Sequence, residues 1–210
     1  MNATTRFRGA LLEALDPLME SVGFGRRKNC FAWTRRISND LTDSVHLNFG
    51  LYPVAGRISV LPTLGVRFAS IETALIAAGV VPKEQSRDRS TVGFAMRPPT
   101  ASAYEFTAAD APVVAAETLW SDLKSGPLAR LETLRTLDRV VDSLSSPEPE
   151  QWGILSRSVR ARVLPLALRA AGREVDALTT LAQLEGEMRD VDQLVPSFDD
   201  FAGWFRGRVA

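Results

Sequence analysis

The sequence predicts an α+β fold, in which an antiparallel sheet of about four strands is backed by helices and followed by a helical hairpin. In residues 43–68 the apolar side chains fall on alternate positions, which is typical of strands with one buried face. The alternating residues are Val45, Leu47, Phe49, Leu51, Ile58, Val60, Pro62, Leu64 and Val66. After residue 150 the apolar spacing is helical instead, so the strands belong to the first part of the chain.

The chain begins with a predicted helix over residues 7–22, whose apolar side chains recur at helical spacing. Pro17 lies inside it, and because proline lacks a backbone N–H we expect a bend there or two short helices. Gly23 is placed to end the helix in the left-handed conformation that suits glycine.

The two runs in residues 43–68 are expected to form a hairpin, and further strands are predicted on both sides of it. Residues 29–37 precede it and residues 90–97 follow it, while Tyr104 and Phe106 indicate an edge strand. Trp33 and Phe49 are expected to be buried between the sheet and the helices. Since the strands mostly follow one another in sequence, we expect antiparallel pairing.

The later helices lead to a predicted boundary. A short helix is expected to end at Gly79, another to begin at Asp110, and a third to run from Pro127 to Leu144. Residues 145–150 are polar and rich in proline, which is typical of a linker. The sequence therefore predicts a sheet domain at 1–144 and a helical subdomain at 151–210.

Charges are segregated in the predicted tail helices, which turn at Gly172. Residues 157–173 hold five arginines and no acid, whereas residues 174–192 hold six acids and one arginine. Pairing of the two helices would set Arg157 and Arg160 opposite Glu185 and Glu187. A basic groove for an acidic partner is the alternative.

Composition favours a soluble protein. Lys plus Arg and Asp plus Glu both number 25, so no overall field attracts nucleic acid or an anionic membrane. No apolar run approaches the roughly 20 residues that span a bilayer, and acids interrupt the apolar N-terminal stretch that a signal peptide would need. The single cysteine fits a reducing compartment. We expect a cytoplasmic protein with no membrane partner.

No pattern of catalytic, metal-binding or nucleotide-binding residues stands out. Cys30 and His46 are the only residues of their types, and nothing in the sequence supplies the third group that would orient such a pair. We therefore expect no catalytic residue, no metal and no cofactor. An enzyme whose Asp, Glu and Arg side chains come together only in the fold is the alternative.

Residues 15–24, Leu-Asp-Pro-Leu-Met-Glu-Ser-Val-Gly-Phe, are followed by basic residues and then by Phe31-Ala32-Trp33-Thr34-Arg35. Over residues 7–68 the chain resembles a bacterial domain-of-unknown-function family, number 4304, whose members begin with a proline-containing helix, a Gly-Phe-basic turn and an aromatic strand. The resemblance implies a binding role of the bacterial immunity-protein type. The tail from Trp152 resembles a single tetratricopeptide-type hairpin, which also implies protein contacts.

These observations favour a non-catalytic module that binds another protein. If strand alternation holds, Arg35, His46, Asn48 and Tyr52 share an exposed sheet face, and Arg and Tyr often anchor interfaces. Weak nucleic-acid binding through the basic cluster Arg26 to Arg36, with its interleaved aromatic residues, is a further alternative. It is disfavoured because the net charge is zero and no RNA-binding motif is present.

Overall fold

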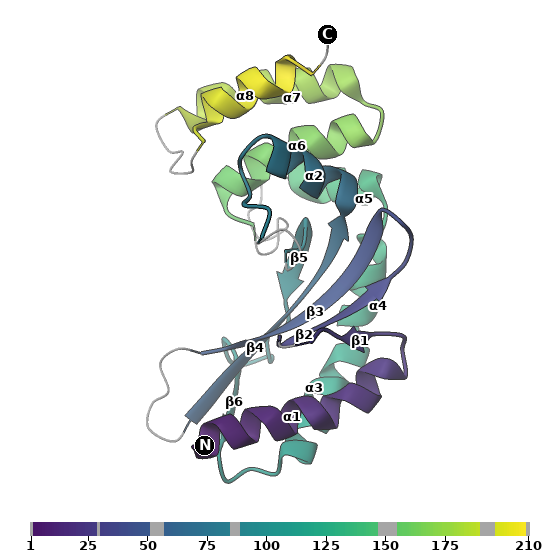
Figure 1. The fold of residues 1–210 in the computed structure, drawn as a ribbon, viewed down its shortest axis with the longest axis vertical. Helices are drawn as coiled ribbons and strands as arrows, with labels where there is room; N and C mark the ends of the chain where they lie inside the picture. Colours follow the sequence, from purple (N-terminus) through teal and green to yellow (C-terminus); the bar gives the residue numbers. More distant parts are fainter. Residues whose placement is uncertain are drawn as a thin grey trace. The chain divides into compact units, whose positions relative to one another are not determined.

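The computed structural model describes residues 2–28, 30–50, 57–84, 89–146, 155–189 and 196–208, and its fold is α+β (Figure 1). The helices are α1 (Ala3–Glu20), α2 (Ala69–Ala77), α3 (Pro112–Lys124), α4 (Pro127–Thr133), α5 (Leu137–Ser145), α6 (Arg157–Ala170), α7 (Glu174–Met188) and α8 (Phe198–Arg206). The strands are β1 (Gly25–Arg26), β2 (Ala32–Arg36), β3 (Leu41–Phe49), β4 (Arg57–Phe68), β5 (Val92–Ala95) and β6 (Tyr104–Thr107).

The strands form one antiparallel sheet in the order β1-β2-β3-β4-β5, and β6 also pairs with β4. The predicted strands are all present, and the short β1 is an addition. Arg35 of β2 lies opposite Asp43 of β3, and Ala32 lies opposite His46. Side chains of directly opposed residues point to the same sheet face, so this register decides which predicted residues share a surface.

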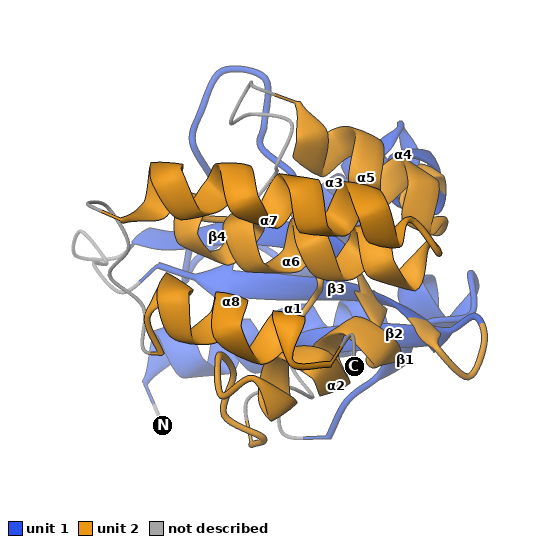
Figure 2. Ribbon diagram, turned by 90° about the horizontal axis from the view of Figure 1, so that it is seen from above, with its two compact units in different colours: residues 1–37, 42–65, 94–132 blue, residues 38–41, 66–93, 133–210 orange. Residues whose placement is uncertain are grey.

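The chain divides into two compact units, which Figure 2 colours separately. Unit 1 comprises residues 1–37, 42–65 and 94–132, and unit 2 comprises residues 38–41, 66–93 and 133–210. Each unit builds its own core around a long helix.

In unit 1, α1 packs beside α3 and lies against the strands (Figure 1). Asn2 caps α1 through its side chain, and the helix continues through Pro17, so of the two alternatives expected there the division into two short helices is wrong. Trp33 is buried as expected, whereas Phe49 is only half-buried. Phe49 is the last residue of β3.

In unit 2, α6 lies at the centre and contacts α2, α5, α7 and α8 (Figure 2). Because α2 and α5 precede the predicted linker, the packing does not divide the chain into 1–144 and 151–210. Residues 147–150 of that linker lie outside the described residues. The helix expected from Pro127 to Leu144 is in fact two, since Thr136 caps a new helix, α5.

The arginines of α6 mostly serve the interior of unit 2. The Arg162 side chain is fully buried, and its guanidinium donates to the carbonyls of Ser158 and Pro196, both at 2.9 Å. Arg160 Nε donates to the Leu144 carbonyl at 2.6 Å, and its burial lowers the pKa of its guanidinium. Because Arg160 and Arg162 are buried and bind backbone carbonyls, these two arginines do not line a basic groove.

The predicted pairing of α6 with α7 is right for one pair and wrong for the other. Arg157 lies 3.4 Å from Glu187. Glu185 pairs instead with Arg206 of α8 through two hydrogen bonds, which lower the pKa of the Glu185 carboxyl. The pairing prediction considered only α6 and α7, whereas Arg206 of α8 binds Glu185 and Arg160 binds the Leu144 carbonyl.

Within the described residues, no helix is both long enough and apolar enough to cross a bilayer.

Candidate functional site

Arg35 is a structural residue of unit 1. Its Nε and Nη2 donate to Asp43 Oδ2 at 3.2 and 2.9 Å, and its Nη1 donates to the Val22 carbonyl at 2.9 Å. The guanidinium also lies 4.5 Å from the centre of the Phe24 ring. The Asp43 side chain is fully buried, so Arg35 neutralises an interior carboxylate and joins the turn after α1 to β2 and β3.

The structure therefore separates Arg35 from the other predicted partner-binding residues. The register sets Arg35 on the face of Asp43, and strand alternation sets His46 and Asn48 on the opposite face. Asn48 is exposed, and its amide nitrogen donates to the Leu61 carbonyl and to Thr63 Oγ1. His46 is half-buried. Tyr52 lies outside the described residues, so the shared surface is wrong for Arg35 and stays a prediction for the rest.

The aromatic residues near the basic cluster differ sharply in burial. Phe24 and Trp33 are each 1% exposed, whereas Phe31 is 45% exposed. Trp33 donates through Nε1 to Asp16 Oδ1 at 2.9 Å, and Asp16 also pairs with Arg26 at 3.1 Å. Of these three rings, only Phe31 is available to a ligand.

Two hollows adjoin Phe31 in unit 1. One, of about 760 Å³, is lined by Asn2, Thr4, Thr5, Arg8, Phe31, Leu47, Asn48, Phe49 and Gly50. The other, of about 570 Å³, is lined by Leu12, Arg26, Arg27, Lys28, Cys30 and Phe31. Because both hollows include Phe31, this exposed ring stands between them. We call the surface made by Arg8, Arg27, Lys28, Phe31 and Phe49 the Phe31 surface.

Aromatic and cationic groups are in direct contact on the Phe31 surface. Phe31 meets Phe49 edge to face, with ring centres 4.9 Å apart. The Arg8 guanidinium lies 4.8 Å from the centre of the Phe49 ring, within the range of a cation–π interaction. Among the described residues, Arg8 Nε is buried and has no hydrogen-bond partner. Arg8 is thus oriented by an aromatic ring rather than by a carboxylate.

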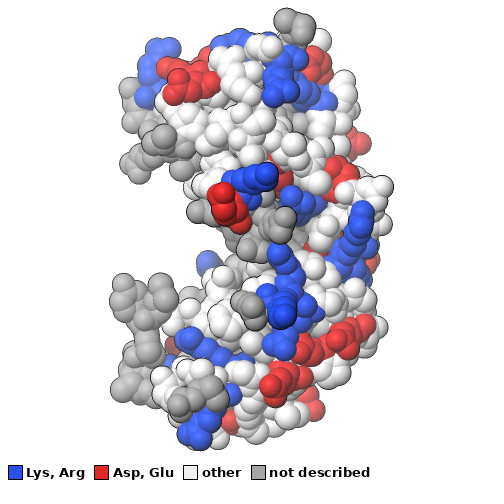
Figure 3. All heavy atoms as spheres, viewed as in Figure 1, with Lys and Arg blue, Asp and Glu red and all other residues white. Residues whose placement is uncertain are grey.

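No acidic side chain is among the described residues that line either hollow. Over the face of the protein that Figure 3 shows, basic and acidic side chains are interspersed. Asp16 offsets Arg26, and the linings of the two hollows also hold Arg8, Arg27 and Lys28.

Arg8 and Phe49 were not among the site residues predicted from sequence. A signal for Arg8 exists, because residues 8, 12 and 16 lie on one stripe of α1 at helical spacing. Leu12 lines the second hollow and Asp16 binds Trp33, so this stripe faces the strands. Phe49 is the last residue of β3, and the alternating pattern alone does not show whether a residue at a strand end is covered.

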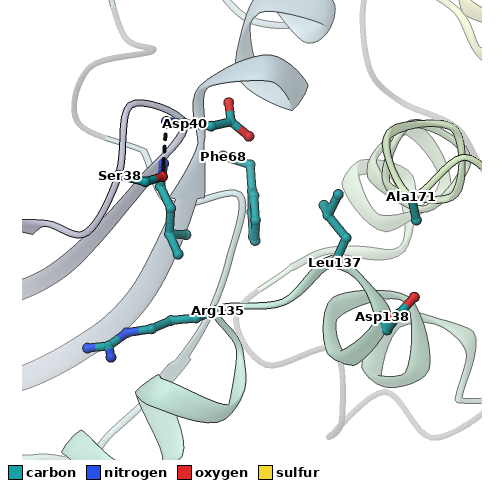
Figure 4. Close-up of a pocket in the computed structure, with 8 residues that line it drawn as sticks. Ser38, Asp40, Phe68, Arg135, Leu137, Asp138 and Ala171 are labelled. Carbon is teal, nitrogen blue, oxygen red and sulfur yellow. Dashed lines mark hydrogen bonds between the residues drawn. The ribbon is translucent and has the colours of Figure 1, made fainter.

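A hollow of about 400 Å³ in unit 2 is the place where the alternative of an assembled Asp and Arg site can be examined (Figure 4). It is lined by Ser38, Asp40, Leu41, Phe68, Arg135, Leu137, Asp138 and Ala171. Both carboxylate oxygens of Asp40 accept hydrogen bonds from Ser70, at 2.7 and 2.9 Å. Figure 4 shows the Arg135 guanidinium directed away from Asp40 and Asp138. Asp40 thus holds the start of α2, and these side chains do not converge on one point.

The Cys30 thiol is turned towards the backbone. It donates to the Arg27 carbonyl at a sulfur–oxygen distance of 3.4 Å, which stabilises the turn before β2. Within the described part of the chain, no group of three or more His, Cys, Asp or Glu side chains could hold a metal ion.

No protein-family model, no curated protein and no solved structure matches this chain.

Proposed function

We propose that this protein is a binding module that takes a protein partner on the Phe31 surface. The observation that carries the proposal is the 45% exposure of the Phe31 ring between two hollows lined by cations. Exposed large apolar side chains are few among the described residues, and Phe31 is the aromatic one in the set Phe31, Ile37, Val113, Val114 and Val175. Aromatic residues and arginine are the residue types enriched at the energetic centres of protein interfaces.

A protein partner fits this surface better than a nucleic acid does. Single-stranded nucleic acids bind along a series of aromatic platforms. Phe24 and Trp33 belong to the core, and Arg35 is bound to Asp43, so the cluster from Arg26 to Arg36 loses most of its expected contacts. One exposed ring with a compact set of cations is the pattern of a small protein epitope.

The immunity-type role implied by the resemblance belongs to this class of function. A toxin that docks on the Phe31 surface would be held without any chemistry by this chain. Asn48, which lines the first hollow, would lie at the margin of this contact, whereas His46 is not among the residues that line either hollow.

The test is affinity capture from the native host with three forms of the full chain. Phe31→Ser removes the exposed ring, and Val175→Ser is the matched control, because Val175 is 77% exposed and lies in unit 2. Proteins held by the wild type and by Val175→Ser, but lost with Phe31→Ser, are the expected result. Equal capture by all three forms, with Phe31→Ser still folded by circular dichroism, would contradict the proposal.

A further inference from the structure

We infer that the segment bound by the Phe31 surface is an acidic peptide stretch with an apolar side chain between its carboxylates. This inference rests on the proposed function and names the chemistry of its partner. It follows from the placement of cations around Phe31 and from the size of the two hollows.

The cations lie on both sides of the ring. Arg8 lines one hollow, and Arg27 and Lys28 line the other. A ligand that covers Phe31 therefore meets positive charge in both directions along its chain. Acids on both sides of a central apolar residue complement that arrangement, whereas a basic segment would be repelled on both sides.

Arg8 is prepared to bind a carboxylate. Its contact with the Phe49 ring fixes the guanidinium before any ligand arrives, which lowers the entropy lost on binding. Its buried Nε has no partner among the described residues. A carboxylate in the first hollow would form a charge-assisted hydrogen bond with the guanidinium, and such bonds are about twice as strong as neutral ones.

The apolar side chain of the ligand is expected to pack against the rings of Phe31 and Phe49. Phe31 and Phe49 meet edge to face and leave Phe31 45% exposed, so an aliphatic or aromatic side chain can cover the open ring. The hollows measure about 760 and 570 Å³. Sites of roughly 300–1,000 Å³ hold small ligands, so each hollow has room for one or two side chains of a peptide.

The experiment is a selection from a random peptide library displayed on phage, with the full chain immobilised. Peptides that bind the wild type are tested again on Phe31→Ser and on Lys28→Glu. The expected peptides carry a net negative charge and an apolar residue, and bind Phe31→Ser about tenfold more weakly or worse. Lys28→Glu, an exposed change that leaves the ring in place, should weaken the same peptides and favour less acidic ones.

The outcomes separate the two levels of the proposal. Peptides that depend on Phe31 but are neutral or basic would overturn the acidic-segment inference and leave the binding function intact. Failure of every selected peptide to depend on Phe31 would overturn both. Single-stranded oligonucleotides are tested as competitors of the selected peptides. Displacement of the peptides by oligonucleotides would assign the surface to nucleic acid and would overturn both proposals.

Discussion

Two basic regions of this chain resemble each other in sequence but differ in the burial and the partners of their cations. The region from Arg26 to Arg36 in unit 1 and helix α6 in unit 2 both carry arginines close to aromatic or apolar residues. In α6, Arg160 and Arg162 are buried and donate to backbone carbonyls. In unit 1 the roles are divided, since Arg35 binds a buried acid while Arg27 and Lys28 line an open hollow.

The difference depends on the burial of the neighbouring aromatic ring. The Arg162 guanidinium lies 5.4 Å from the centre of the Phe198 ring, and Phe198 belongs to the core. Arg8 lies beside Phe49, which is half-buried and in contact with the exposed Phe31. The cation–π contact of Arg162 therefore belongs to the core of unit 2. The contact of Arg8 with Phe49 instead leaves a positive charge close to the exposed Phe31 ring.

The largest effect is expected from Arg35→Met in unit 1. Removal of one partner of a buried ion pair leaves the other charge uncompensated, so the free energy of unfolding should fall by about 3 kcal/mol. Urea denaturation of this variant and of the exposed control Arg6→Met in α1, expected within about 0.5 kcal/mol of wild type, measures the difference. A loss under about 1 kcal/mol for Arg35→Met would mean that Arg35 is not structural and is available to a partner.

Arg162→Met in α6 should cost somewhat less, about 2 kcal/mol. The carbonyl of Pro196 loses a charged donor, while the methionine side chain keeps much of the packing against Phe198 and Phe201. Arg173→Met is the control, because Arg173 is exposed and pairs only at the surface with Asp176. Equal stability of the two variants would contradict the structural role of the α6 arginines.

In unit 2, a buried carboxyl should make the stability depend on pH. Burial raises the pKa of Glu72 in unit 2 above its ordinary value of 4.5, although a hydrogen bond from Thr91 and the charges of Arg89 and Arg67 oppose the shift. A carboxyl with a raised pKa contributes stability that is complete below its unfolded pKa and is lost as the pH rises through its folded pKa. The contribution of Glu72 therefore declines from about pH 4.5 upward.

Glu72→Gln removes the titrating group and keeps its shape. The difference in unfolding free energy between wild type and Glu72→Gln should shift in favour of the variant as the pH rises above 4.5. Glu84→Gln, in the described loop after α2, is the surface control. A difference that stays constant with pH would mean that Glu72 titrates normally in the fold.

The smallest effect is expected for the surface pair Arg157 and Glu187. Both side chains are about half exposed, so a double-mutant cycle with alanine should give a coupling energy below about 1 kcal/mol. The cycle with Arg160 and Glu185 should give no direct coupling, since these residues bind Leu144 and Arg206. Strong coupling between Arg160 and Glu185 would restore the pairing expected from sequence.

Alternation of apolar residues predicted most of the sheet, because every second side chain of a strand points to its buried face. Alternation also places Arg35 on the same sheet face as Trp33, which lies two residues earlier. The prediction that Arg35 is exposed came only from its charge. Only the opposed Asp43, which is eight residues away, explains why a cation can lie there. Helical spacing indicates which face of α1 holds Arg8, but contacts between different elements, such as Arg8 with Phe49 or Arg206 with Glu185, leave no local pattern in the sequence.

The central claim is that Arg8 and Lys28 of the Phe31 surface are available to an acidic ligand and that the buried Arg160 and Arg162 of α6 are not. Titration of the isotopically labelled full chain with hexaglutamate, followed through arginine side-chain and backbone N–H signals by NMR, tests it directly. We expect chemical-shift changes at the Arg8 Nε–H and at the backbone N–H groups of Arg27 and Lys28. We expect none at the Nε–H of Arg160 or Arg162. Shifts that are larger in α6, or equal at all exposed cations, would contradict it.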